Sequence, residues 1–154
     1  MADVLQIDLT DFELFKSFAE IEGHGLYIDL HNEFKCDSII FQNQKRELVL
    51  SFSTEPAFKK KAKQVDIIFE DITIELFSMK DDNELPGAWT IDNIYRGRFE
   101  IDSGILSDVS NDGRYYYYID FYQDYSFELF AKAVKANVFL DDRTNIINLI
   151  PKPK

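Results

Sequence analysis

Residues 108–113 read Asp-Val-Ser-Asn-Asp-Gly, which matches the opening of a calcium-binding loop. Such a loop places oxygen ligands at alternate positions, turns at a glycine and closes with a bidentate glutamate. Ile119 stands where that glutamate belongs, and Asp120 follows one residue late. A polar hairpin turn would use the same residues. Calcium binding by this segment therefore stays open as an alternative. Our prediction is that the protein holds no metal and no other cofactor.

Histidine and cysteine could supply other chemistry, but both are scarce. His24 and His31 are the only histidines, and Cys36 is the only cysteine. Their spacing fits no zinc pattern, and nothing near them in the sequence supports a His–Cys catalytic pair. Two carboxylates could hydrolyse a glycosidic bond, but 28 acidic residues make close pairs inevitable. We therefore expect no catalytic residues and no enzyme activity.

An acidic segment leads to the single tryptophan. Asp81, Asp82 and Glu84 precede Trp89, with an apolar residue between them. Carboxylates around an aromatic anchor are typical of surfaces that dock a basic partner. The alternative is a solvated loop whose indole is buried in the core, because large aromatic side chains are usually well buried. We take these four residues as candidate partner-binding residues.

Four consecutive tyrosines, residues 115–118, form the most aromatic segment. On a strand, Tyr116, Tyr118 and Tyr122 share one face, and the odd-numbered residues share the other. The outer face could be a platform for a ligand or partner, since tyrosine offers a large contact area at a small loss of entropy. It could equally be an aromatic ladder that stabilises the sheet. We take Tyr116 and Tyr118 as further candidate partner-binding residues.

The net charge points to the kind of partner. Asp and Glu total 28 and Lys and Arg total 17, so the formal net charge is −11. Such a surface repels nucleic acid and anionic membranes and attracts basic molecules. We therefore expect a basic protein partner, no nucleic acid and no membrane. The oligomeric state stays open.

The composition favours one cytoplasmic domain. A chain of 154 residues has the length of an ordinary domain, and 45% of its residues are hydrophobic. A single cysteine cannot form an internal disulfide, and no secretory signal is apparent at the N-terminus. We expect a globular domain over residues 1–150, with a frayed tail at 151–154.

The elements that must position these side chains are one helix and about eight strands. Thr10 and Glu13 fit a capping box, which predicts a helix at 11–22 that ends at Gly23 and Gly25. Period-two patterns predict the strands, and residues 102–113 read as a polar loop. The predicted strand regions are 26–30, 37–42, 47–52, 65–69, 72–77, 89–101, 114–122 and 126–140, and the last of these would also suit a helix.

This pattern predicts an α+β fold that is mainly β. The strands would form an antiparallel sandwich or a strongly curved sheet, and the single N-terminal helix would cover one face or edge. Since the strands alternate, one face of each sheet would carry the charged residues.

Several segments resemble small acidic bacterial immunity proteins of polymorphic-toxin systems. The segments are residues 30–34, 48–52, 65–72 and 117–129, and the third reads V-x-I-x-F-x-D-I. The resemblance implies a protein that binds and blocks a cognate toxin, often a basic nuclease, with an acidic patch. It carries over no specific binding residue.

Three function classes follow. The first is a non-enzymatic binding protein of the immunity or antitoxin type that inhibits a basic toxin. The alternative is a β module that binds a small ligand or carbohydrate through its aromatic strand. A hydrolase with converging carboxylates ranks last, because no spacing in the sequence indicates one.

Overall fold

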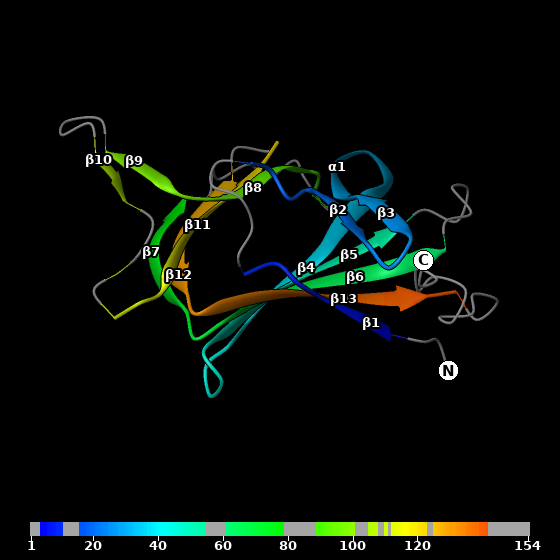
Figure 1. The fold of residues 1–154 in the computed structure, drawn as a ribbon, viewed down its shortest axis with the longest axis horizontal. Helices are drawn as coiled ribbons and strands as arrows, with labels where there is room; N and C mark the ends of the chain where they lie inside the picture. The colour runs from blue at the N-terminus through cyan, green and yellow to red at the C-terminus, as the bar shows by residue number, and fades with distance from the viewer. Residues whose placement is uncertain are drawn as a thin grey trace, which may run out of the picture.

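Two antiparallel sheets form most of the molecule (Figure 1). The structure, a computed structural model, describes residues 4–10, 16–54, 61–78, 89–100, 105–107, 110, 112–122 and 125–141. The larger sheet has five strands, which are in spatial order β1 (Val4–Asp8), β13 (Ala133–Leu140), β6 (Ala62–Glu70), β5 (Glu47–Thr54) and β4 (Phe34–Gln42).

The smaller sheet has four strands and is accompanied by two hairpins and one short helix. Its strands are in spatial order β7 (Thr73–Ser78), β12 (Tyr125–Ala131), β11 (Tyr115–Phe121) and β8 (Ile91–Arg96). The hairpins are β2 (Glu20–Gly23) with β3 (Leu26–Asp29), and β9 (Arg98–Glu100) with β10 (Ile105–Ser107). The helix α1 (Leu30–Glu33) follows β3. Among the described residues, no helix is long and apolar enough to cross a membrane.

The expected α+β, mainly β fold with packed antiparallel sheets and one short helix is confirmed. The described residues form 13 strands rather than about eight, because two predicted strands are divided and three further strands, β1, β2 and β10, lie where none was predicted. One of the additional strands, β10, lies inside the segment that we expected to be a polar loop. The predicted hairpin of 37–42 and 47–52 is confirmed as β4 and β5, and residues 126–140 are two strands and no helix.

The two sheets are joined by a bent pair of strands. β6 pairs with β13 in the larger sheet, and their continuations β7 and β12 pair in the smaller one. Only Asp71 and Ile72 separate β6 from β7, and only Lys132 separates β12 from β13. Asp71 takes a positive φ of 49°, and the Lys132 amide still bonds to the Glu70 carbonyl at 2.9 Å. The ladder therefore continues through the bend, as it does where strands change sheets in a corner.

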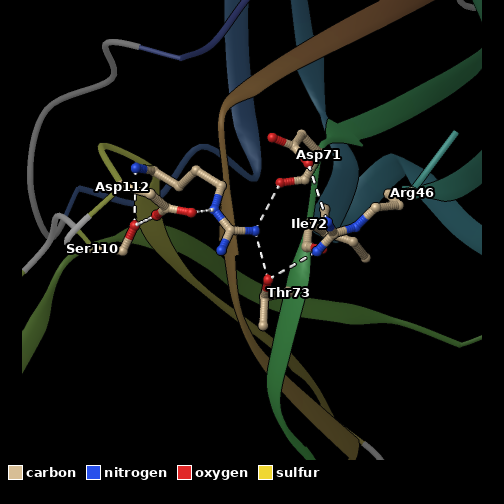
Figure 2. Close-up of polar contacts among 7 residues, drawn as sticks. Arg46, Asp71, Ile72, Thr73, Ser110 and Asp112 are labelled. Carbon is tan, nitrogen blue, oxygen red and sulfur yellow. Dashed lines mark hydrogen bonds and ion pairs between the residues drawn. The ribbon is translucent and has the colours of Figure 1, made fainter.

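Two arginines hold this bend (Figure 2). Arg46, in the turn between β4 and β5, donates to the Ile72 carbonyl at 2.9 Å and to Thr73 Oγ1 at 3.2 Å. Arg114, directly before β11, donates to the same hydroxyl oxygen at 2.5 Å and to the Asp71 carbonyl at 3.2 Å. We call Arg46, Thr73 and Arg114 the corner clamp, because the two arginines tie the β4–β5 turn and the start of β11 to this bend at Thr73.

The hydrophobic core lies between the two sheets. Tyr117 of β11 is fully buried, and its ring meets Phe69 of β6 at 5.5 Å between centroids. Phe18, in the segment before β2, covers another side of that ring at 6.2 Å. The Tyr117 hydroxyl donates to the Thr10 carbonyl at 3.2 Å, so this buried phenol has the partner that it requires.

The predicted helix at 11–22 is wrong over its described second half. Residues 16–19 are not helical, and Glu20–Gly23 is the strand β2; residues 11–15 lie outside the described part of the chain. Thr10 bonds across the sheet instead of capping a helix. Its hydroxyl accepts from the Val134 amide at 3.0 Å and donates to the Val134 carbonyl at 3.3 Å. Pairing with the neighbouring strand outweighs the local capping signal.

The glycines that we expected to end a helix instead form a hairpin turn. β2 pairs with β3 so that Gly23 faces Leu26, and the two residues between them are His24 and Gly25. Their φ angles are 53° and 78°. Positive φ at both central residues is what a two-residue type I′ hairpin loop requires. The hairpin places Ile21 and Ile28 in the core and turns the alternate side chains outward.

Candidate functional site

Three of the six residues taken from the sequence as partner contacts lie outside the described part of the chain: Asp81, Asp82 and Glu84. Trp89 is described and is half-buried. Its ring packs on Tyr125 at 4.3 Å and on Phe121 at 5.5 Å between centroids. Its backbone pairs with that of Cys36 through hydrogen bonds of 2.9 and 2.7 Å. Trp89 therefore fastens the start of β8 to β4, and most of its contacts are internal.

The tyrosine run is also largely internal, since none of the four tyrosines is exposed. Tyr116 keeps only 2% of its surface accessible, donates a hydrogen bond to Glu128 and packs on Phe130. Tyr118 is half-buried and stacks on Tyr95 at 5.2 Å. Burial, and then the charge of Asp120, raises the pKa of both stacked phenols, so both remain protonated at neutral pH. This face is an aromatic ladder that stabilises the sheet.

Tyr27 is an exposed ring with carboxylates beside it. It lies on the outer face of the β2–β3 hairpin and keeps 51% of its surface accessible. Glu22 stands directly opposite it in the strand pair, and Glu20, also in β2, adds a second negative charge that acts on the phenol. Desolvation, and then the charges of Glu20 and Asp29, raises the pKa of the Tyr27 phenol. The ring thus points to solvent within a negative field.

The short helix α1 is fixed by its N-cap. The Asp29 carboxylate accepts from the backbone amides of His31 at 3.1 Å and Asn32 at 3.0 Å, and from the Asn32 side chain at 2.7 Å. Only 7% of Asp29 is accessible, so these bonds satisfy a carboxylate that would otherwise be buried without partners. The cap fixes the start of α1 and therefore the position of His31 within it.

His31 joins α1 to a second exposed tyrosine. Its Nδ1 bonds to the Ile91 carbonyl at 2.8 Å, and its Nε2 lies 3.0 Å from the hydroxyl of Tyr122. Tyr122 keeps 56% of its surface accessible. Desolvation, and then the charge of Asp92 and its hydrogen bond, raises the pKa of the Tyr122 phenol. This cluster again sets an exposed phenol beside a carboxylate.

Both clusters adjoin α1, since Tyr27 lies in β3 directly before the helix and Tyr122 contacts His31 within it. The helix contacts β2, β3 and β8, and Figure 1 shows it beside the β2–β3 hairpin. We call the combined surface the acid–aromatic band. Its members are Glu20, Glu22, Tyr27, His31, Asp92 and Tyr122. Lys35 lies near the band, and its ammonium donates to the Thr90 hydroxyl at 2.7 Å.

The other sequence candidates form no reactive site among the described residues. Burial raises the pKa of the Cys36 thiol to about 12, and its sulfur bonds to the Ser38 carbonyl at 3.5 Å. It is therefore a protonated core side chain rather than a nucleophile. No group of three or more His, Cys, Asp and Glu side chains in the described part of the chain is arranged to hold a metal ion.

The calcium-like segment is only partly described. Its described residues form a turn in which the Arg114 amide donates to the Ser110 hydroxyl oxygen at 3.0 Å (Figure 2). Asp112 pairs with the Arg114 guanidinium at 2.9 Å and accepts a hydrogen bond from the Ser110 hydroxyl. The bond from Ser110 first, and that from Arg114 second, lowers the pKa of Asp112. This carboxylate supports the corner clamp. Asp108 and Asn111 lie outside the described residues.

None of the six residues taken from the sequence as partner contacts belongs to the acid–aromatic band. Strand parity put Tyr122 on the outer face, but Tyr27 was not singled out. The available signal was the alternation of Leu26, Tyr27 and Ile28, with Tyr27 as the outward residue. Comparison with protein-family models, curated proteins and solved structures finds no match to this chain.

Proposed function

We propose that this chain is a non-enzymatic binding protein that captures a cationic protein through the acid–aromatic band. The observation that supports this most is Tyr27, a half-exposed ring next to Glu20 and opposite Glu22. A tyrosine offers a broad apolar face and a polar tip, and such residues supply much of the binding energy at interfaces. Carboxylates beside the ring select a partner of positive charge.

The whole-molecule charge supports the same partner class. A net charge of −11 steers a cationic protein towards this chain and can raise the association rate by roughly 10–10³-fold. The resemblance to immunity proteins favours a basic toxin domain as that partner. Because the single cysteine is a free thiol, we place this interaction in the cytoplasm, a reducing compartment.

The aromatic strand gives the carbohydrate alternative no support. That function needs a row of exposed rings, but Tyr116 and Tyr117 are buried and Tyr115 and Tyr118 are half-buried. The rings pack on the sheet and on one another.

The experiment is affinity capture from a lysate of the source organism at low and at high ionic strength. The bait is the wild-type chain, the band variant Glu20→Gln/Glu22→Gln, or the control variant Glu47→Gln/Glu75→Gln, which removes the same charge elsewhere. We expect wild type and control to retain one cationic protein at low salt, and the band variant to lose it. Recovery of no cationic protein, or equal recovery by all three baits, would count against the proposal.

A further inference from the structure

We infer that the acid–aromatic band releases its cationic partner at mildly acidic pH, because the two histidines of the chain gain positive charge beside its carboxylates. This inference rests on the proposed function and adds a regulation of the same surface. Three features support it: the positions of the histidines, the hydrogen bonds of His31 and the charges that surround both rings.

Both histidines of the chain lie on elements that form the band. His31 belongs to α1 and contacts Tyr122. His24 is exposed and stands in the turn between the strand of Glu22 and the strand of Tyr27. Histidine is the side chain whose ordinary pKa puts its change of charge between about pH 5 and 8. The side-chain charge that the chain gains in this range is therefore gained at the band.

The hydrogen bonds of His31 hold its ring in both charge states. The Ile91 carbonyl, at 2.8 Å, can only accept, so Nδ1 carries a hydrogen. In the neutral ring, Nε2 has a lone pair and accepts from the Tyr122 hydroxyl at 3.0 Å. In the charged ring, Nε2–H donates to the same hydroxyl oxygen, because a phenol can both donate and accept. His31 can therefore take up a proton without losing a partner.

The Tyr122 hydroxyl hydrogen, which leaves His31 in this change, has other acceptors. Tyr122 keeps 56% of its surface accessible, so its hydroxyl can turn to water. Asp92, whose charge acts on the same phenol, offers a carboxylate. The Tyr122 amide donates to the Thr90 carbonyl at 3.0 Å, which holds this residue beside the start of β8. Rotation of one hydroxyl completes the change.

The charged groups around His31 are mostly acidic. α1 packs against β2, β3, β4 and β8. The carboxylates on these elements and on α1 are Glu20, Glu22, Asp29, Glu33, Asp37 and Asp92. The cations are Lys35 and Arg96, and the Arg96 guanidinium lies over the Tyr115 ring at 4.7 Å. The phenols of Tyr27, Tyr95 and Tyr122 and the Cys36 thiol have raised pKa values and stay neutral in this range.

The surroundings of His24 are also mostly acidic. Glu22 precedes it on β2, and β1, which packs against β2, ends at Asp8. Lys61 is a cation near this turn, because it lines a small cavity beside it. A proton on His24 therefore adds positive charge to the end of the hairpin that carries Tyr27.

Protonation of both histidines offsets most of the charge that attracts the partner. The band holds three carboxylates, those of Glu20, Glu22 and Asp92. Two imidazolium ions would balance two of these three charges, whereas the net charge of the whole chain would change only from −11 to −9. We therefore expect the band to lose its attraction for cations while the molecule stays strongly acidic.

The test measures the enrichment of a cation at the band of the intact protein. The probe is a nitroxide that carries a trimethylammonium group, and an uncharged hydroxyl nitroxide is its reference. Each probe speeds the relaxation of the amide protons that it approaches, so the ratio of the two effects measures the local attraction for a cation. We expect this ratio at the Gly23, Gly25 and Tyr27 amides to fall about two- to fivefold between about pH 7.5 and about pH 5.5, where carboxylates stay ionised. The Val134 and Lys135 amides, on the larger sheet, should change less.

Three variants separate the histidines from other effects of acid. His24→Asn/His31→Gln carries no histidine, and asparagine suits the positive φ of 53° at position 24. Its ratio should stay constant between the two pH values. His24→Asn alone leaves α1 unchanged and should lose part of the fall. Tyr122→Phe keeps both histidines and should retain it.

Affinity capture tests the release itself. The cationic protein that is retained at about pH 7.5 and low salt should elute from the wild-type bait at about pH 5.5 and stay on the bait without histidines. A constant ratio in wild type, an equal fall in the variant without histidines, or elution from both baits would overturn the inference. If capture succeeds and the ratio stays constant, the proposed function stands without this regulation. If no cationic protein is captured at either pH, the proposed function and the release are both wrong.

Discussion

Tyr27 is the residue on which partner binding should depend most. Tyr27→Ala removes the exposed ring, and we expect it to weaken binding of the captured protein by about 2 kcal/mol, roughly 30-fold. Tyr27→Phe keeps the ring and loses only the hydroxyl, so its effect should be several-fold smaller. Isothermal titration calorimetry of both variants measures the difference. Equal losses would mean that the ring face makes no contact with the partner.

Cys36 gives a residue-scale prediction that is independent of any partner. Burial raises the pKa of its thiol to about 12, so the native protein should react very slowly with a maleimide at about pH 8. The folded pKa lies above the unfolded pKa of about 8.5. The protonated thiol therefore makes its full contribution to the free energy of unfolding below about pH 8.5. This contribution is lost as the pH rises towards 12. Rapid labelling of the folded protein would contradict this burial.

At the scale of elements, the corner clamp should hold the bend between the two sheets. Arg114 is 14% exposed at its side chain and Arg46 is 55% exposed, although both bond to Thr73. We therefore expect Arg114→Met to lower the free energy of unfolding by about 1–3 kcal/mol, and Arg46→Met to lower it by less. Urea denaturation compares the two variants. A larger effect of Arg46→Met would contradict the clamp.

Asp112 should make the clamp sensitive to acid. Hydrogen bonds from Ser110 and Arg114 lower its pKa in the folded state. Its contribution to stability is therefore present above the unfolded pKa of about 3.9 and is lost as the pH falls through the lower folded pKa. Asp112→Asn should flatten this part of the curve of unfolding free energy against pH. Parallel curves for wild type and variant below about pH 4 would argue against the assignment.

The elements also show why the fold was largely predictable and the candidate site was not. Alternation predicted β4, β5, β6 and β11, because each of these strands has buried residues on one face, and it predicted β7 although no residue of that strand is buried. The helix prediction at 11–22 failed because Thr10 bonds across the sheet and Glu20–Gly23 pairs with β3. Once residues 20–22 were assigned to a helix, nothing placed Glu20 and Glu22 beside Tyr27.

At the scale of the whole molecule, long-range pairing decides which residues form a surface. The acid–aromatic band combines the β2–β3 hairpin, α1, the start of β8 and the residue after β11, segments that span positions 20 to 122. Trp89 and the tyrosine run were prominent in the sequence, but packing between strands takes up most of their surface. Composition predicts that the partner is cationic. Only the fold gives a position where carboxylates of this chain lie beside exposed rings.

The most direct test of this account is the association rate constant for the captured cationic protein, measured by stopped flow as a function of ionic strength. We expect the rate of the wild-type chain to fall steeply as salt is added, because the attraction is electrostatic. The variant Glu20→Gln/Glu22→Gln should start slower and show a shallower dependence, whereas Glu47→Gln/Glu75→Gln should stay close to wild type. Identical slopes for the two double variants would contradict the claim that the acid–aromatic band is where the partner lands.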